Sequence, residues 1–239
     1  MNRTVLVTGS ALRIGNAIAR RLGASGWNVV IHANRSVAQA DALCSELNAA
    51  GHRAWRVAGD LSAAGGPEAV FDAAVAQAGT LDALVNNASV FGRQSLASAT
   101  SLDFERQWRV NTLAPILLTQ RFAAHIAARR AAGCVVNLLD QRIAHVHAGA
   151  IPYLLSKKAL EAFTLSAALE LAPAVRVNAV APGAVLPAVT DGAKEPAGAF
   201  PLGFRPSVDH VADAVAYLLE APALTGQILH VDGGQHLAP

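Results

Sequence analysis

The chain has 239 residues, of which 53% are hydrophobic and 15% charged, and its formal net charge at pH 7 is +2. This length fits one sizeable α/β domain, and the apolar content excludes a disordered chain. Basic residues are scattered along the chain, so nucleic acid is a poor candidate partner. The apolar runs are too short for a membrane span or a signal-peptide core, which predicts a soluble cytoplasmic protein.

Strand-like apolar runs alternate with helical patterns along the whole chain. The runs are mostly continuous rather than alternating, as expected for parallel strands covered on both faces. Repeated β-α-β units predict an α/β fold over residues 1–239: a single doubly wound Rossmann domain whose seven-stranded parallel sheet has helices on both faces. The segment 184–206 has no clear period and is interpreted as a loop over a site. The expected strands are residues 4–8, 28–33, 53–58, 81–88, 133–139, 175–182 and 227–233.

The first strand runs into TGSALRIG, residues 8–15, which opens a helix. A strand, Gly9, Gly15 and a helix N-terminus together form an arrangement that can receive a pyrophosphate. No Lys follows Gly15, so this is not a P-loop, and the middle glycine of GxGxxG is missing. On its own the turn therefore also fits a tight βα connection without a ligand.

The end of the second strand indicates which dinucleotide would bind. A ribose 2'-hydroxyl is normally held by an Asp or Glu about 20 residues after the glycines. Here the sequence has Asn34, Arg35 and Ser36, with no acid until Asp41. A guanidinium and a hydroxyl suit a 2'-phosphate, which favours NADPH over NADH, whereas a solvated arginine is the alternative.

YLLSK places Tyr153 and Lys157 about one helical turn apart. A phenol is a poor proton donor or acceptor at neutral pH unless a nearby ammonium stabilises its phenolate. The spacing alone is common by chance. Its combination with the glycine turn, NNAS at 86–89 and PG at 182–183 is not a chance one.

These motifs resemble the short-chain dehydrogenase/reductase family over essentially the whole chain, together with Asp60-Leu61, Asn111 and the C-terminal VDGG. The resemblance implies a catalytic set in which Tyr153 is the general acid, Lys157 binds the nicotinamide ribose and lowers the tyrosine pKa, and Asn111 holds a water of the proton relay. It also implies a homotetramer built through the helices around Asn111 and Tyr153. The implied cofactor-binding residues are Gly9, Arg13, Ile14, Gly15, Asn34, Arg35, Ser36, Asp60, Leu61, Asn87, Ala88, Ser89, Tyr153, Lys157, Pro182, Gly183 and Val185.

Two departures from the general family pattern are informative. Most members have glycine where Arg13 stands and serine where Asp140 stands, and both changes resemble the pteridine reductases and dihydromonapterin reductases. Ser89 and Phe91 of NNASVF occupy positions that in pteridine reductases touch the cofactor and stack on the pterin. The resemblance implies substrate contacts from Arg13, Ser89, Phe91, Asp140 and Tyr153. The alternatives are that Asp140 only caps a loop and that Phe91 only fills the core.

The chemistry of Asp140 supports the same reading. A serine donates a hydrogen bond to the alkoxide that forms when a ketone is reduced, whereas an ionised aspartate only accepts and repels that oxyanion. An aspartate is useful when the substrate offers N–H groups or when a ring nitrogen needs a proton. Reduction of a C=N bond in a pterin meets both conditions.

The sequence thus predicts an NADPH-dependent reductase that transfers hydride to a C=N bond of a dihydropterin, with Asp140, Tyr153, Lys157 and Asn111 as catalytic residues. One alternative is reduction of a ketone, aldehyde or 3-oxoacyl substrate, with Asp140 incidental. A second is a binding protein that senses NADP(H) without turnover. No metal is predicted, because His145 and His147 have no third ligand nearby in the sequence.

Overall fold

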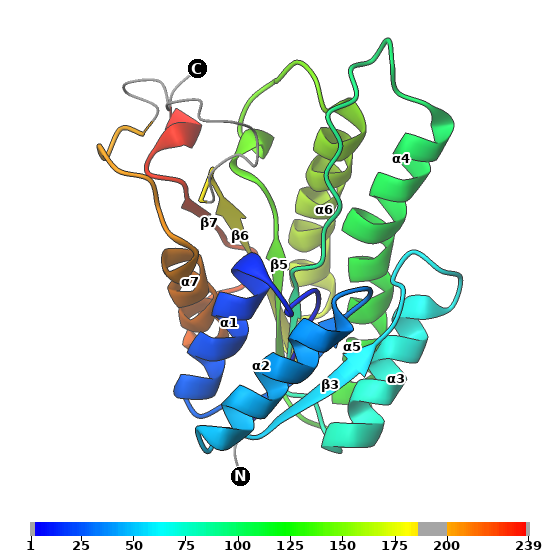
Figure 1. The fold of residues 1–239 in the computed structure, drawn as a ribbon, viewed down its shortest axis with the longest axis vertical. Helices are drawn as coiled ribbons and strands as arrows, with labels where there is room; N and C mark the ends of the chain where they lie inside the picture. Colours follow the sequence, from blue (N-terminus) through cyan, green and yellow to red (C-terminus); the bar gives the residue numbers. More distant parts are fainter. Residues whose placement is uncertain (1–2, 186–199, 238–239) are drawn as a thin grey trace.

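The computed structural model describes residues 3–185 and 200–237. Seven parallel strands form one sheet in the order β3-β2-β1-β4-β5-β6-β7, which confirms the predicted doubly wound architecture (Figure 1). Fourteen residues of the expected loop, 186–199, lie outside the described part. The strands are β1 Thr4–Val7, β2 Asn28–Ala33, β3 Ala54–Ala58, β4 Ala83–Asn86, β5 Gly133–Leu138, β6 Val175–Pro182 and β7 Ile228–Val231.

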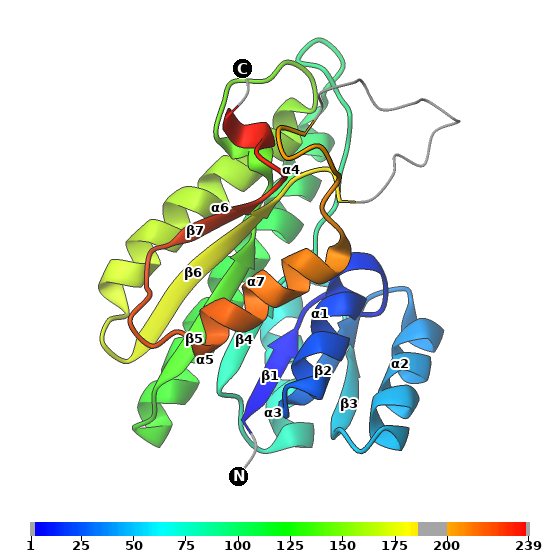
Figure 2. The same cartoon turned by 90° about the vertical axis from the view of Figure 1, so that its left-hand side faces the viewer.

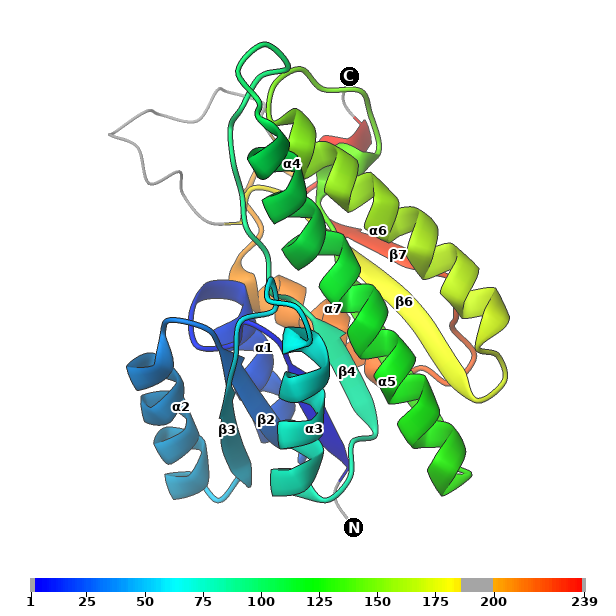
Figure 3. The ribbon, with the colours of Figure 1, turned by 90° about the vertical axis from the view of Figure 1, so that its right-hand side faces the viewer.

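Helices cover both faces of the sheet. Figure 2 shows α1, α2 and α7 on one face, and Figure 3 shows α3, α4, α5 and α6 on the other. A π-helical turn, Arg109–Leu113, joins α4 to α5, and two 3-10 turns follow β5 and β7, at Gln141–Ile143 and Gln235–Leu237. The helices are α1 Arg13–Ala24, α2 Val37–Ala49, α3 Gly66–Ala78, α4 Ser101–Trp108, α5 Ala114–Arg129, α6 Ile151–Glu170 and α7 Val208–Glu220.

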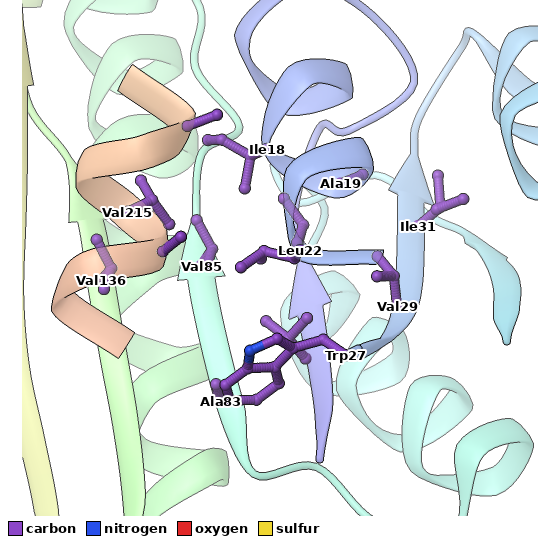
Figure 4. Packing of buried hydrophobic residues seen from close by; sticks show 14 of the residues in the cluster. Ile18, Ala19, Leu22, Trp27, Val29, Ile31, Ala83, Val85, Val136 and Val215 are labelled. Carbon is purple, nitrogen blue, oxygen red and sulfur yellow. The ribbon is translucent and has the colours of Figure 1, made fainter. Parts of the chain in front are cut away.

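The central strand β1 explains why its run is apolar throughout. Successive side chains of a strand point to opposite faces. Val5 and Val7 accordingly pack with α1 and α7, whereas Leu6 packs with α3 and α5. Figure 4 shows the first of these layers, in which Leu22 of α1 and Val215 of α7 lie close to Val85 of β4.

The sheet has a switch point that positions the site. Leu6 of β1 is in register with Val30 of β2 on one side and with Leu84 of β4 on the other. The chain therefore leaves β1 in one direction and returns from β3 across the sheet to β4. In doubly wound folds, ligands bind beyond the carboxyl ends of the strands at such a point.

Candidate active site

A cleft of about 560 Å³ lies beyond the carboxyl ends of β1, β2 and β4. It extends from the glycine turn to Tyr153 of α6 and includes fourteen of the predicted site residues. The predicted residues that line it are Gly9, Arg13, Ile14, Gly15, Asn34, Arg35, Ser36, Asp60, Leu61, Asn87, Ala88, Ser89, Phe91 and Tyr153. Arg106 and Val110, from α4 and the π-helical turn, also line the cleft and were not predicted.

The glycine turn has no room for a side chain at Gly9 or at Gly15. A Cβ on Gly9 would lie 2.9 Å from the Cα of Ala88, and a Cβ on Gly15 would lie 2.5 Å from the oxygen of Gly9. The hydroxyl of Thr8 accepts hydrogen bonds from the backbone N–H of Asn87, at 2.9 Å, and of Ala88, at 3.0 Å. These hydrogen bonds join the ends of β1 and β4. Because Gly9 and Gly15 have no side chains, a ligand can approach the backbone of the turn and the first turn of α1.

Arg13 begins α1 in a left-handed conformation, with φ of 56°. Such a φ is unfavourable for a residue with a Cβ and would suit a glycine better. The exposed side chain borders the cleft and makes no hydrogen bond or ion pair with residues 3–185 or 200–237. Arg13 therefore has a guanidinium available for a ligand at a cost in backbone strain.

The residues after β2 form the far end of the cleft. Asn34, Arg35 and Ser36 face Asp60, which follows β3. Hydrogen bonds from Ser62 and then from Asn34, together with the charge of Arg35, hold the pKa of Asp60 below its ordinary value, although partial burial opposes this. Arg35 is the positive group that a 2'-phosphate would meet, and no carboxylate occupies the position expected for a ribose 2'-hydroxyl.

His32 supports the turn from below and was not predicted. Its Nδ1 accepts a hydrogen bond from the Gly9 N–H at 3.0 Å, and its Nε2 lies 3.1 Å from the Gly59 oxygen. Burial lowers the pKa of His32, which favours the neutral ring. In the sequence, His32 is visible only as one residue of an apolar run. Its role depends on the contact between β2 and the turn after β1, which the sequence does not show.

Tyr153 and Asp140 meet directly. The Tyr153 hydroxyl donates to Asp140 Oδ2 at 2.9 Å, joining α6 to the end of β5. The ring of Phe91 stands edge-on to the Tyr153 ring, with centroids 4.8 Å apart. The Phe91 side chain is 51% exposed, which excludes the alternative that it only fills the core.

Arg142 is the main functional candidate that sequence reasoning missed. Its Nε donates to Asp140 Oδ1 and its Nη2 to Asp140 Oδ2, both at 3.0 Å, and its backbone N–H donates to Oδ1 at 2.9 Å. The guanidinium also lies over the rings of Phe91, at 5.3 Å, and Tyr153, at 5.4 Å. Its position two residues after Asp140 is the only sequence signal.

Arg142 determines the charge of Asp140. Burial would raise the pKa of this carboxyl, but the hydrogen bonds and charge of Arg142 outweigh burial and lower it. Asp140 is therefore an ionised acceptor at neutral pH. It also caps the 3-10 turn after β5, so the capping alternative and a contact with the site hold at the same time.

The resemblance implies that Lys157 lowers the pKa of Tyr153, whereas in this structure the pKa of Tyr153 is raised. Burial lowers the pKa of Lys157 to about 8, although the charge of Asp140 opposes this. Burial and the negative charge of Asp140 raise the pKa of Tyr153 well above its ordinary value. Lys157 Nζ donates to the Leu138 oxygen at 2.7 Å and lies 5.9 Å from the Tyr153 ring centroid. In this structure the tyrosine is thus held protonated.

Asn111 lies in the π-helical turn, fully buried, rather than in a regular long helix. Its Oδ1 accepts from the Val90 N–H at 2.8 Å and from Ser89 Oγ at 3.1 Å, and its Nδ2 donates to Ser156 Oγ at 3.0 Å. These bonds connect the segment after β4 to α6.

The remaining predicted cofactor contacts follow β6. Pro182 ends this strand, the Gly183 N–H donates to the Val231 oxygen at 3.0 Å, and the Val185 N–H donates to the Gly183 oxygen at 2.8 Å. They do not line the cleft of about 560 Å³, nor do Asp140, Asn111 and Lys157.

His145 and His147 follow the 3-10 turn after β5. Their ring centroids are 6.4 Å apart, and His145 Nε2 lies 2.7 Å from the backbone oxygen of His236.

In the described ranges, no helix is both long and apolar enough to cross a membrane.

A doubly wound parallel sheet, a glycine turn that admits only bare backbone and a tyrosine-lysine pair on one helix define a Rossmann-type oxidoreductase. The family model of short chain dehydrogenases matches residues 3–197. The chain belongs to the short-chain dehydrogenase family.

Relatives of differing specificity match nearly the whole chain. A pteridine reductase 1 from Leishmania tarentolae is 34% identical, with 97% of this chain and 96% of that protein covered. A putative ketoacyl reductase 2 of the granaticin polyketide synthase from Streptomyces violaceoruber is 35% identical, with 97% and 95% covered. A crystal structure of FolM alternative dihydrofolate reductase 1 from Brucella suis in complex with NADP has a TM-score of 0.91 at 34% identity, with 99% and 96% covered.

Proposed function

We propose that the protein is an NADPH-dependent reductase that transfers hydride to a C=N bond of a dihydropterin. One observation carries the choice of substrate: the ionised carboxylate of Asp140, paired with Arg142, lies 2.9 Å from the Tyr153 hydroxyl beside the exposed ring of Phe91. This arrangement offers an acceptor, a proton donor and an aromatic face within one site.

The cleft fits the dinucleotide. Gly9 and Gly15 leave backbone accessible to a pyrophosphate, and Arg13 and Arg35 border the same cleft without an ion pair among the described residues. Arg35 and Ser36 would hold the 2'-phosphate, and Arg13 would lie beside the pyrophosphate. NADPH supplies the hydride when bound. NADP in the Brucella suis neighbour supports this choice of cofactor.

Tyr153 would deliver the proton to the substrate nitrogen. Its raised pKa keeps the phenol protonated at neutral pH but also makes it a weaker acid, so proton transfer would depend on stabilisation of the phenolate by the Lys157 ammonium. Lys157 would bind the nicotinamide ribose, and Asn111 would hold a water behind the tyrosine. The segment at Pro182 and Gly183 would contact the nicotinamide.

Asp140 would bind the substrate by accepting hydrogen bonds from the N–H groups of the substrate. A pterin edge presents N–H donors, which an ionised carboxylate accepts strongly. A ketone instead develops an oxyanion, which the same carboxylate would repel. Since Arg142 keeps Asp140 ionised, we assign it the acceptor role and leave proton delivery to Tyr153.

Reduction of a ketone or a 3-oxoacyl substrate is the second candidate. The 35% identical ketoacyl reductase relative favours it, because identity to the pteridine reductase is no higher. In this reading Asp140 would only cap the turn after β5 and pair with Arg142.

We also expect a cytoplasmic homotetramer. Apolar side chains exposed on α4 and α6 support assembly through this face, since large exposed apolar surface marks interaction sites. These side chains are Leu102, Trp108, Leu155, Leu165 and Leu169.

The test is NADPH oxidation by the purified protein with 7,8-dihydropterins, quinonoid dihydropterin and simple ketones, repeated with NADH. We expect dihydropterin turnover with NADPH. Asp140→Ser should lower kcat/KM for the dihydropterin by about 10- to 100-fold, the value of a hydrogen bond to a charged group, and leave any ketone activity unchanged or higher. Ketone turnover without dihydropterin turnover would contradict the proposal.

A further inference from the structure

A cluster of two histidines and an aspartate lies where β7 runs into the C-terminal 3-10 turn. His230 is on β7, Asp232 follows this strand, and His236 is in the turn. One potential ligand atom of each residue lies within 4.8 Å of the others. Asp232 is 2% exposed, and both histidines are partly buried. None of the three lines the cleft described above.

His230 lacks a partner that its position demands. Its Nδ1 is buried and makes no hydrogen bond to the described part of the chain. A buried polar atom without a hydrogen-bond partner destabilises the fold. The His230 ring stacks on that of His236, with centroids 4.0 Å apart and planes at 22°, so the unpaired nitrogen lies beside a second imidazole.

The side chains of Asp232 and His236 are held in place by hydrogen bonds. The Nδ1 of His236 and the Oδ2 of Asp232 are 2.8 Å apart, which is a hydrogen-bond distance. Two tetrahedral ligands of Zn²⁺ stand about 3.3–3.5 Å apart, so metal binding requires these two atoms to separate slightly. Asp232 Oδ1 accepts from the Gly234 N–H at 2.9 Å, and Oδ2 accepts from the His236 N–H at 2.7 Å. These bonds fix the carboxylate and the turn before any ion arrives.

We propose that His230, Asp232 and His236 bind a divalent transition metal ion of the Zn²⁺ type. Neutral imidazole nitrogens and a carboxylate oxygen are ligands that zinc prefers, and water would complete a tetrahedral site. When the metal is bound, the neutral ring of His236 would carry its proton on Nε2, so that the Nδ1 lone pair beside Asp232 Oδ2 is free to coordinate. The unpaired nitrogen of His230 gains its partner in the same step.

The site would connect the C-terminal turn to the end of β6. A Cβ on Gly183 would lie 2.7 Å from the Cβ of Asp232, and the Gly183 N–H donates to the oxygen of Val231, the residue between His230 and Asp232. The Ala184 N–H donates to Gln235 in the turn at 3.2 Å. A bound metal therefore holds together the backbone that follows Pro182.

Metal binding is measured directly on the full chain, without a reductase assay. The protein is stripped with a chelator, titrated calorimetrically with ZnCl₂, and titrated separately with Co²⁺ while visible absorption is recorded. We expect one ion per chain, the strong absorption of tetrahedral Co²⁺, and a higher midpoint of thermal unfolding with Zn²⁺.

His230→Ala and His236→Ala should each weaken binding at least about tenfold, which is the lower value for loss of even an outer partner of a metal site. His52→Ala, in the turn between α2 and β3, is the matched control and should bind as the parent does. The circular dichroism of His230→Ala should match that of the parent, which checks that the variant folds. Absence of stoichiometric binding, or equal affinity in His230→Ala and His52→Ala, would overturn the proposal.

Discussion

At the scale of single residues, Asp140 combines opposing influences. Burial favours its protonated form, whereas Arg142 and the Tyr153 hydroxyl stabilise its charge. A buried carboxylate with one bidentate partner remains charged only while that partner is present. Arg142 thus acts on Tyr153 through Asp140, because the Asp140 charge is a principal cause of the raised tyrosine pKa.

Arg142→Met tests this dependence. Without the guanidinium, burial should raise the pKa of Asp140, and the acidic limb of kcat/KM against pH should move to higher pH. Arg93→Met is the control, since Arg93 also lies over the Phe91 ring, at 6.0 Å, but has no bond to Asp140. An acidic limb that is the same in both variants would refute the role of Arg142.

Lys157 should make stability depend on pH in the alkaline range. Its folded pKa of about 8 lies below the ordinary 10.5, so between these values the unfolded chain holds a proton that the folded chain has lost. Stability should therefore rise with pH across that window, by up to about 3 kcal/mol, and fall again above the ordinary pKa of Tyr153.

Lys157→Met should lack this rise, because methionine does not titrate. Urea unfolding of both proteins at several pH values between about 8 and 10 measures the difference. A constant difference in unfolding free energy across the window would mean that Lys157 is not desolvated as the structure has it.

At the scale of elements, the start of α1 combines a strained backbone with a functional charge. Arg13 has φ of 56°, and a left-handed residue with a Cβ costs about 1–2 kcal/mol. Strain of this kind persists where the residue serves a site. The start of α1 is held in place because Gly9 and Gly15 fit closely against the residues that follow β4.

Arg13→Gly should separate strain from charge. It should raise the unfolding free energy by about 1 kcal/mol and weaken NADPH binding, whereas Arg13→Ala should weaken NADPH binding without the gain in stability. Denaturant unfolding and fluorescence titration with NADPH measure the two effects. Equal stability of the two variants would show that residue 13 is not strained.

At the scale of the whole molecule, cofactor binding should be visible as stability. A ligand at 100 times its Kd adds about 2.7 kcal/mol, which for a chain of this size raises Tm by about 5–10 °C. NADP⁺ should give this increase at a concentration where NAD⁺ gives less. Arg35→Asp should reverse the preference, and Arg53→Asp, with the same charge change at the start of β3, should leave it unchanged. A preference for NADP⁺ that survives Arg35→Asp would contradict the assignment of Arg35.

The sequence by itself determined the sheet, because buried parallel strands need continuous apolar runs and each of the seven was visible. It also determined the local pairs: Tyr153 and Lys157 are one turn apart on a helix, and the glycine turn follows directly from β1. The sequence did not determine where each strand ends. The run at 81–88 is only β4, Ala83–Asn86, since Asn87 and Ala88 instead bond to Thr8.

Only the tertiary structure decided what the charged and aromatic groups do. Arg142 gave little signal in the sequence because its effect on Asp140 and Tyr153 depends on how the turn after β5 meets α6. The trio of His230, Asp232 and His236 depends likewise on the fold of the last turn. Apolar periodicity is a property of each segment alone, whereas pKa values and ligand sets arise from distances between segments, and those distances exist only once the sheet has assembled.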